Sequence, residues 1–558
     1  MRTVDTRHRG AAAGALAILL MLAGCSAEQG EEATAKQGAS AHDTHAEAGD
    51  IGKVDFRVSC AKEARPSFDH ALGMLHHMMY EQAREEFARV STDHPDCAMA
   101  YWGEATTLFQ PLWPTRPTTE DLKRGWELTQ KAREIGSESG REQRLLAATE
   151  AFFRDPDRAD WWTRIRRWAE GMQVAYEALP DDTETAALYA LSRLALAYVA
   201  EDRAPLHAEA AGILLAIWDR EPTHPGAVHY TIHTNDAEGR GSDSPEVVGS
   251  YGEIAPDVPH ALHMPTHIQV RLGRWPEVIK WNARSAAAAL RQPAGDEVSP
   301  HYLHAVDYQV YAHLQQGKDR EANAIFERAM AVGRHQPGFV AAFHLAAMPA
   351  RLALEPRDWA RAAALTPRTP DYLPWDTSIW AEGLAWFARG VGAARTGDLQ
   401  KAEQSEQRLA ELRGKAEAAG EKGFATYIEV DRMILAGWIA HAQGKPEEAV
   451  GNLRAAAELE GTVEKHPVTP GAVYPPYEAL GDLLLALDRP TEALAAYQSS
   501  DRRWPGRYNT LLGAGRAAEA GGRREDAHRQ YSALLRNAGQ SERAGVAEAK
   551  RFVELPPS

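Results

Sequence analysis

Apolar and polar positions repeat with a helical period over most of this chain. Alanine-rich amphipathic segments dominate the sequence, and runs of β-branched residues are few. Apolar residues that recur every three or four positions predict helices with one buried face. One helical hairpin cannot bury its apolar face alone, so the pattern predicts hairpins that stack along the chain. We therefore expect an all-α protein.

The helical pattern itself repeats at the carboxyl end. Small and aromatic positions return 34 residues later, where Gly481, Ala493 and Tyr497 recur as Gly515, Ala527 and Tyr531. This spacing resembles that of tetratricopeptide-repeat (TPR) proteins, clearly over residues 430–535 and less regularly over 65–335. The resemblance implies a TPR-like α-solenoid of stacked helical hairpins. The segments CAMAYWGEA, HPGAVHYTIH and PHALHMPTHI resemble a bacterial branch of such proteins, which implies no particular activity.

The amino terminus has the pattern of a bacterial lipoprotein signal over residues 1–25. A basic start is followed by an apolar stretch at 11–21 and by the tetrapeptide LAGC, which ends at Cys25. This tetrapeptide resembles a lipobox and implies cleavage before Cys25 and acylation of that cysteine; a plain secretory signal is the alternative. Residues 26–55 are small, polar and acidic, which predicts a flexible tether. We expect a membrane-anchored lipoprotein of the cell envelope, facing the periplasm or the cell exterior.

The remaining chain divides by composition into three segments. Residues 56–205 are predicted to form amino-terminal TPR-like repeats, 206–335 a histidine-rich set of repeats, and 336–558 the carboxyl-terminal TPR repeats. Proline-rich insertions at 366–376 and 461–476 interrupt the last segment, because proline stops helices. Each insertion either folds over the groove of the repeats or projects from the surface.

Cysteine content, net charge and motifs limit the compartment, the partners and the enzyme classes that fit this chain. After signal cleavage only Cys60 and Cys97 remain as candidates for a disulfide, which an extracytoplasmic compartment permits. A formal net charge of −16 argues against nucleic acid as a partner. The sequence lacks the phosphate-binding GxxxxGK[ST], the zincin HExxH and the hydrolase GxSxG motifs.

Histidines gather in the middle of the chain, where ten of the 22 lie between His207 and His313. With Gly273 in the turn between two helices of a repeat, the first helix of that repeat starts near Pro259. The TPR resemblance implies that side chains of three consecutive first helices line one concave groove. These are His229 and His233, then His260, His263 and His267, and then His304 and Asp307.

The spacing of these histidines predicts a metal site. Residues four apart on a helix lie one above the other, so His229 with His233, and His263 with His267, can direct two ring nitrogens at one point. Imidazole suits zinc, copper and iron. The surrounding polar residues Asp236, Asp307, Tyr302 and Tyr308 are placed to fix the tautomers of the ligands. The number of candidate ligands also allows a binuclear centre.

Other interpretations remain open at this point. The histidines can form a pH-sensitive or hydrogen-bonding groove, or be unrelated to each other. Pro265 must start or kink its helix, which weakens the assignment of His260 and His263. His76 and His77 are interpreted as part of a packed helix. Two functions follow: a transition-metal protein, either an enzyme or a metal-handling protein, or a metal-free TPR scaffold that binds an envelope protein or peptide in its groove.

Overall fold

A computed structural model describes residues 50–200 and 202–554 of the chain. The predicted signal, Cys25 and most of the tether lie outside the described residues. These described residues belong to one compact unit. Its described residues contain helices and connecting loops and no β-strand, so the prediction of an all-α fold is confirmed.

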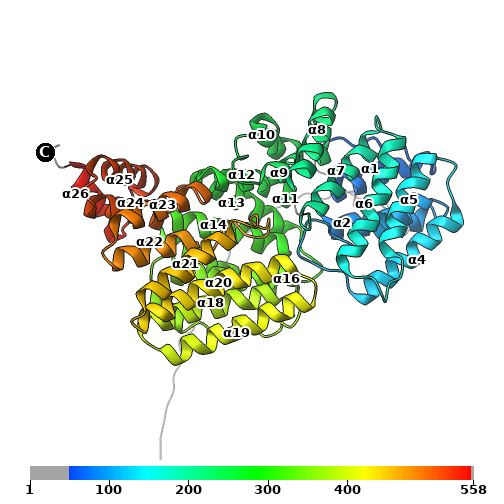
Figure 1. The fold of residues 1–558 in the computed structure, drawn as a ribbon. Helices are drawn as coiled ribbons and strands as arrows, with labels where there is room; N and C mark the ends of the chain where they lie inside the picture. Colours follow the sequence, from blue (N-terminus) through cyan, green and yellow to red (C-terminus); the bar gives the residue numbers. More distant parts are fainter. Residues whose placement is uncertain (1–49, 201, 555–558) are drawn as a thin grey trace, which may run out of the picture. The chain divides into compact units, whose positions relative to one another are not determined.

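Consecutive helices pack against each other along the described chain (Figure 1). After a short 3₁₀ turn (Lys62–Ala64), the amino-terminal helices are α1 (Arg65–His76), α2 (Tyr80–Asp93), α3 (Ala98–Thr106), α4 (Thr119–Ile135), α5 (Gly140–Phe153), α6 (Trp161–Ala178), α7 (Thr183–Ala197) and α8 (Ala204–Arg220). The central helices are α9 (Pro225–Asn235), α10 (Pro245–Ile254), α11 (Pro259–His263), α12 (Pro265–Arg271), α13 (Trp275–Arg291), α14 (Pro300–Gln315) and α15 (Asp319–Ala331).

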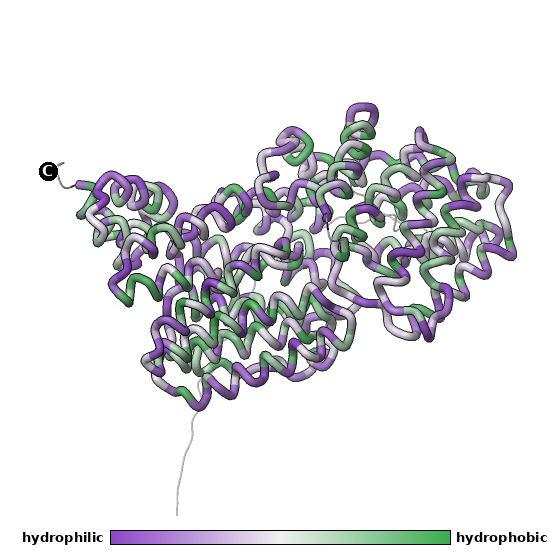
Figure 2. Tube along the Cα trace, in the orientation of Figure 1, coloured by the Kyte–Doolittle hydropathy of each residue, from purple (hydrophilic) through white to green (hydrophobic). Residues whose placement is uncertain are grey.

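The carboxyl-terminal segment continues the same arrangement. Its helices are α16 (Phe339–Leu354), α17 (Trp359–Ala363), α18 (Ile379–Thr396), α19 (Leu399–Ala418), α20 (Lys422–Ala442), α21 (Pro446–Glu460), α22 (Pro476–Ala486), α23 (Pro490–Arg503), α24 (Tyr508–Ala520), α25 (Arg524–Ala538) and α26 (Ala544–Glu554). Figure 2 shows hydrophobic and hydrophilic residues alternating along these helices, as the amphipathic pattern of the sequence predicts.

Small residues set the distance between paired helices. A Cβ atom added at Gly481 in α22 would lie 2.7 Å from the ring of Tyr497 in α23. The same ring meets Gly513 of α24, where an added Cβ would lie 2.3 Å away. Tyr497 therefore fills the space within its own hairpin and toward the next, as the TPR pattern implies.

Two turns confirm the repeat frame used to place the histidines. Gly273 joins α12 to α13 with φ +63°, and Gly317 joins α14 to α15 with φ +64°. Glycine adopts this left-handed conformation without the steric penalty that other residues meet. The first helix predicted to start near Pro259 begins there as α11, and the first helix of the next repeat, α14, begins at Pro300.

The carboxyl-terminal hairpins also contact the central helices. The indole Nε1 of Trp275 donates to the carbonyl of Gly506 at 2.9 Å, and the Arg507 guanidinium donates to the Tyr311 hydroxyl at 2.9 Å. These residues are more than 190 positions apart in the chain. The repeats thus contact distant repeats as well as their neighbours.

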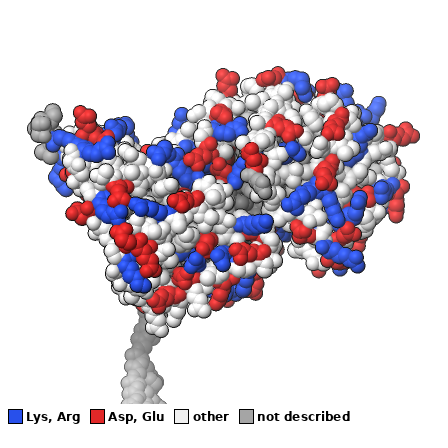
Figure 3. Space-filling view, in the orientation of Figure 1, with Lys and Arg blue, Asp and Glu red and all other residues white. Residues whose placement is uncertain are grey.

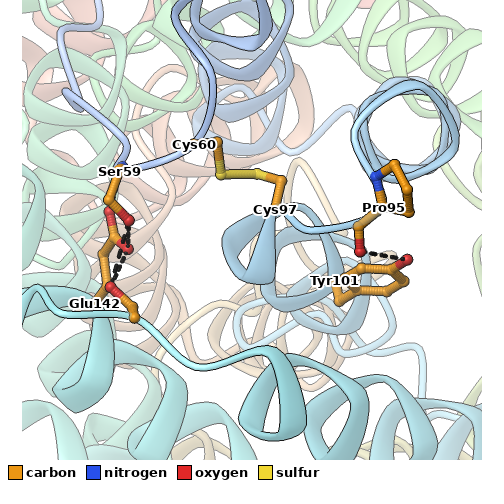
Figure 4. Close-up of a disulfide and its surroundings, with 7 residues drawn as sticks. Ser59, Cys60, Pro95, Cys97, Tyr101 and Glu142 are labelled. Atoms are coloured by element: carbon orange, nitrogen blue, oxygen red, sulfur yellow. Dashed lines mark hydrogen bonds between the residues drawn. A yellow bond between two sulfur atoms is a disulfide. The ribbon is translucent and has the colours of Figure 1, made fainter.

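A disulfide joins Cys60 to Cys97 at the amino-terminal end of the repeats (Figure 4). Beside it, the backbone N–H of Ser59 donates to the Glu142 carboxylate at 2.7 Å. The pairing ties the segment before α1 to the start of α3.

The last residues of the predicted tether, 26–55, belong to the folded unit. The backbone N–H of Lys53 donates to the carbonyl of Thr223 at 3.0 Å. The carbonyl of Ile51 lies 2.9 Å from Nε2 of His77 and accepts its hydrogen bond. Residues 51 and 53, which composition assigned to the tether, therefore contact the folded repeats.

The surface carries charges of both signs. On the face drawn in Figure 3, Lys and Arg residues alternate with Asp and Glu, and no continuous basic strip appears. Within residues 50–200 and 202–554, no helix is long and apolar enough to span a bilayer.

Candidate metal centre

Six histidines from three neighbouring repeats meet in one buried cluster. These are His229 and His233 on α9, His260 and His263 on α11, His267 on α12 and His304 on α14. All of them are at most 8% exposed. We call this set the histidine cluster. The sequence prediction that these residues converge agrees with their placement in the structure.

The cluster divides into two triads. His229, His233 and His260 form the first triad, and His263, His267 and His304 form the second. In each triad, one ring nitrogen per histidine lies within 4.8 Å of those of the other two. The triads touch each other, because the ring centroids of His260 and His263 are 5.9 Å apart and those of His233 and His267 are 6.0 Å apart.

Helix geometry explains how each triad forms. The spacing of four residues places His229 above His233 on α9, with ring centroids 5.0 Å apart. Pro265 divides the next first helix into α11 and α12, so His263 and His267 lie on either side of a break. Their rings still approach to 4.9 Å between centroids. The proline therefore interrupts the helix without separating the two ligands.

Hydrogen bonds fix the tautomers of His263 and His267. Nδ1 of His263 lies 2.6 Å from Oδ1 of Asn282, whose amide nitrogen is turned away and donates to the Val278 carbonyl at 2.8 Å. Nδ1 of His267 lies 2.8 Å from the Asp236 carboxylate. Both Nδ1 atoms therefore carry the proton, because their partners accept. Each Nε2 keeps a lone pair, and the two Nε2 atoms face each other at 2.9 Å.

Each histidine of the first triad has a ring nitrogen without a hydrogen-bond partner among the described residues. Nδ1 of His229 donates to the carbonyl of His76 at 2.6 Å, which leaves a lone pair on Nε2. Among the described residues, Nε2 of His229, Nε2 of His233 and both ring nitrogens of His260 are buried without a hydrogen-bond partner. Buried polar groups nearly always have partners, so this concentration requires an explanation.

Burial keeps these imidazoles neutral. It holds the pKa of His229, His260, His263 and His304 well below the usual range for histidine, and the neighbouring imidazoles act in the same direction. Burial likewise lowers the pKa of His233 to about 3. A neutral imidazole is the form that binds metals.

Asp236 connects the second triad to two buried cations. Its carboxylate accepts hydrogen bonds from Nδ1 of His267, from Nζ of Lys465 at 2.7 Å and from Nε of Arg271 at 2.9 Å. Burial alone would raise the pKa of Asp236, but Lys465 and Arg271 hold it well below its usual range. Asp236 is therefore ionised, and it orients His267 in the way that carboxylates orient metal-bound histidines.

The prediction that Asp307 is a ligand is corrected by its contacts. Its carboxylate accepts from Nε of Arg351 and from Nδ1 of His344, both at 3.0 Å. Nε2 of His344 in turn lies 3.1 Å from Nδ1 of His304. Asp307 thus belongs to neither triad, because the buried Arg351 guanidinium competes for it. It orients His304 indirectly, through His344.

The two tyrosines proposed to fix tautomers differ in position. The Tyr308 hydroxyl lies 3.5 Å from Nδ1 of His267 and donates to backbone carbonyls of the 461–475 loop. Its ring packs on His263 with centroids 4.5 Å apart. Tyr302 instead stacks on His335, outside the cluster. Only Tyr308 is therefore close to the second triad.

A third group of possible ligands is explained by hydrogen bonding alone. Glu184 accepts from Nε2 of His76 at 2.7 Å and from Nε2 of His224 at 3.1 Å. Their Nδ1 atoms are also engaged, by the hydroxyl of Tyr230 and the backbone N–H of Ala227. Every ring nitrogen of this group has a partner, so it needs no ion. The interpretation of His76 as a packed residue agrees with these contacts.

The 461–475 loop between α21 and α22 covers the cluster. Lys465 reaches Asp236 from this loop, and its side chain is fully buried. The hydroxyl of Tyr308 donates to the carbonyl of Pro467 at 3.0 Å, and the Arg351 guanidinium donates to the Thr469 hydroxyl at 2.8 Å. The predicted insertion therefore folds over the groove.

Two cavities reach the edges of the cluster. One has a volume of about 180 Å³ and is lined in part by Trp113 and His301. The Trp113 ring contacts the rings of His260 and His304, with centroids 5.4 and 5.6 Å apart. The other has a volume of about 50 Å³ and reaches His233. The smaller cavity therefore touches the first triad directly, and Trp113 separates the larger one from both triads.

Three residues of this centre were not predicted from the sequence. Asn282 lies on the second helix of its repeat, and His344 lies on α16, 40 residues after His304. Lys465 contacts Asp236 across 229 residues. A sequence signal existed for His344 alone, because it is a single histidine within the otherwise apolar run FVAAFHLAAM.

Comparison with known proteins concerns the fold only. No family model and no curated protein matches the chain. Among solved structures it is similar to a tetratricopeptide repeat protein from Parabacteroides merdae ATCC 43184, with 15% identity over 53% of this chain and 99% of that one and a TM-score of 0.29. It is also similar to the Cut9–Hcn1 hetero-tetramer of the APC/C, with 12% identity over 88% of this chain and 90% of that one and a TM-score of 0.31. The described residues form an all-α array of stacked helical hairpins.

Proposed function

We propose that this chain is a lipid-anchored protein of the cell envelope that binds two transition-metal ions, one in each histidine triad. Zinc, copper and iron all suit three imidazole ligands, and a fourth position stays open in each triad. An open position is what a metalloenzyme or a metal-transfer protein requires.

The observation that carries the proposal is the facing pair of lone pairs on His263 and His267. Two neutral acceptors 2.9 Å apart repel each other unless a cation lies beside both. Zinc–nitrogen bonds of about 2.0–2.1 Å would separate two ligands of a tetrahedral site by about 3.3 Å. The observed separation is within a few tenths of an ångström of that value. The unpartnered nitrogens of the first triad support a second ion there.

The alternative of a metal-free scaffold is less well supported at this place. A TPR groove that receives a peptide must be open, whereas the 461–475 loop covers the histidine cluster. The lack of hydrogen-bond partners for His260 within the described chain also has no explanation in a scaffold. Protein binding elsewhere on the repeats is compatible with the fold.

The envelope location rests on the predicted lipobox at Cys25 and on chemistry. Structural disulfides persist in oxidising compartments, and the Cys60–Cys97 bond supports such a location. Labelling cells with a palmitate analogue tests the anchor. Incorporation that is lost in Cys25→Ala supports it, and equal incorporation in the variant contradicts it.

The metal proposal is tested on the mature protein purified without a histidine tag. Bound metals are measured by mass spectrometry, before and after removal of metal and reconstitution with zinc, copper or iron. We expect two equivalents of one of these metals. His233→Gln and His267→Gln, one from each triad, should each lower the stoichiometry to one equivalent.

His313→Gln is the matched control. His313 lies on α14 with His304 but belongs to neither triad, so this variant should keep both ions. Circular dichroism checks that every variant is folded. Wild-type protein that contains no metal and takes up none on reconstitution would refute the proposed function.

A further inference from the structure

The two triads are built as one centre. Rings of the first triad contact rings of the second at His260 with His263 and at His233 with His267, with centroids about 6 Å apart. The His260 ring also stacks on His304, 6.4 Å between centroids. Ions held in the two triads would therefore be neighbours, because the ligand rings of one triad contact those of the other directly.

The carboxylates beside the cluster, among the described residues, bring no net negative charge to these ions. All six ligands are neutral, and the nearest carboxylates already have cationic partners. Asp236 is paired with Lys465 and Arg271, and Asp307 is paired with Arg351. Two divalent ions would thus bring four charges that no protein carboxylate near the described cluster offsets, at a high cost in free energy unless an anion occupies the open positions.

Monovalent ions halve that charge. Among the transition metals that imidazole binds well, copper has a stable monovalent state, Cu(I). Three neutral nitrogen ligands also suit Cu(I), which accepts low coordination numbers. The charge of the site thus favours copper over zinc and iron.

We propose that the two triads hold a pair of copper ions that binds dioxygen between them. This inference rests on the proposed function and names its metal and ligand. Each Cu(I) would donate one electron, so dioxygen would gain two electrons and become peroxide. The O–O bond order would change from two to one, and no proton would be transferred. The total charge of the two copper ions and the oxygen ligand is +2 before and after the step. The net charge of the buried site therefore does not change.

Access for the gas comes from the cavity of about 180 Å³ beside Trp113. This ring contacts His260 of the first triad and His304 of the second, so the cavity wall adjoins both. His301 lies at the same wall, with its ring 5.3 Å from that of His260, and its Nδ1 is unpartnered among the described residues. The Trp113 ring thus lies between this cavity and the histidines of both triads.

The test loads metal-free protein anaerobically with Cu(I) and then admits dioxygen. We expect two copper ions per chain, uptake of one dioxygen per two copper ions, and a near-ultraviolet peroxide-to-copper charge-transfer band. The paired Cu(II) ions should be silent in electron paramagnetic resonance. Zinc-loaded protein is the control and should show neither uptake nor the band.

The outcomes separate this inference from the proposed function. Copper binding without dioxygen uptake, or a resonance signal from isolated Cu(II) that accounts for most of the copper, overturns the inference and leaves the metal proposal standing. Absence of any metal binding overturns both. These measurements use the wild-type chain, so they do not depend on a variant that folds.

One variant tests the need for a pair. His260→Gln should bind one copper ion and lose the charge-transfer band, because a single Cu(I) supplies only one electron. The substitution breaks no hydrogen bond that the structure describes, since neither ring nitrogen of His260 has a partner in the described chain. His313→Gln should keep the band. A full band in His260→Gln would contradict a two-copper site.

Discussion

Replacing Asp236 by Asn tests the charge balance beside the second triad. The Asp236 carboxylate faces Lys465 and Arg271, whose side chains are 0% and 6% exposed. Asparagine keeps one acceptor oxygen and removes the negative charge, so buried Lys465 loses its counter-ion and Arg271 keeps only Glu464. Breaking a buried ion pair by removing one partner costs about 3–5 kcal/mol. We expect Asp236→Asn to lower the free energy of unfolding of the metal-free protein by that amount.

The same substitution should weaken metal binding. Asp236 orients His267, and loss of such a partner lowers metal affinity by about 10- to 100-fold. Urea denaturation of the chelated protein measures stability, and competition with a chromophoric chelator measures affinity. Asp243→Asn is the control, because Asp243 forms an exposed pair with Arg240 and should cost less than about 0.5 kcal/mol.

The effect of pH has a definite sign. The folded-state pKa of Asp236 lies below its unfolded value, so its contribution is present above the unfolded pKa of about 4 and is lost as the pH falls further. The wild type should therefore converge toward Asp236→Asn under acidic conditions. An Asp236→Asn variant as stable as the control, with unchanged metal affinity, would refute this account of the ion network.

Three further predictions concern the fold. Gly481→Ala should lower the free energy of unfolding by about 1–3 kcal/mol, because its methyl group would meet the Tyr497 ring. Gly451→Ala, which has open space around it, should raise the free energy of unfolding by about 0.5–1 kcal/mol. Thermal melts that rank the two variants in the opposite order would contradict this packing. Reducing the disulfide, which encloses 37 residue steps, should cost about 4 kcal/mol in the chain-entropy estimate, and urea curves with and without reductant measure the difference. Burial lowers the pKa of His77 and of His466 to about 3, so between about pH 6.5 and pH 3 only the unfolded state binds protons at these two side chains. The urea midpoint of the metal-free protein should therefore fall steadily from pH 7 to pH 5. A urea midpoint that does not change with pH would contradict the burial of these histidines.

The sequence predicted the local geometry of the centre well and its long-range contacts poorly. Helical spacing and the turn glycine Gly273 placed His229 with His233, and His263 with His267, on the faces where the structure has them. Helical spacing also placed Asp307 one turn after His304, and on that basis it was predicted as a ligand. Spacing carries no information about Arg351, which takes this carboxylate from another helix.

The covering loop shows the same limit. Proline content predicted that the 461–476 insertion is not helical, and the structure agrees. Its partner could not be predicted, because the contact of Lys465 with Asp236 depends on how many repeats lie between them and on how those repeats curve. Local sequence patterns record neither quantity. The site was thus predictable within a repeat and unpredictable between repeats.

The contacts of Gly506 and Arg507 with Trp275 and Tyr311 have a consequence for how the protein unfolds. In an open array of repeats, the end repeats can fray while the middle stays intact, because each repeat touches only its neighbours. Here the carboxyl-terminal repeats pack on the central helices, so their detachment would expose the helices that carry the histidines. Unfolding should then be a single cooperative transition. A chain truncated at its carboxyl end should neither fold fully nor bind the proposed metal ions.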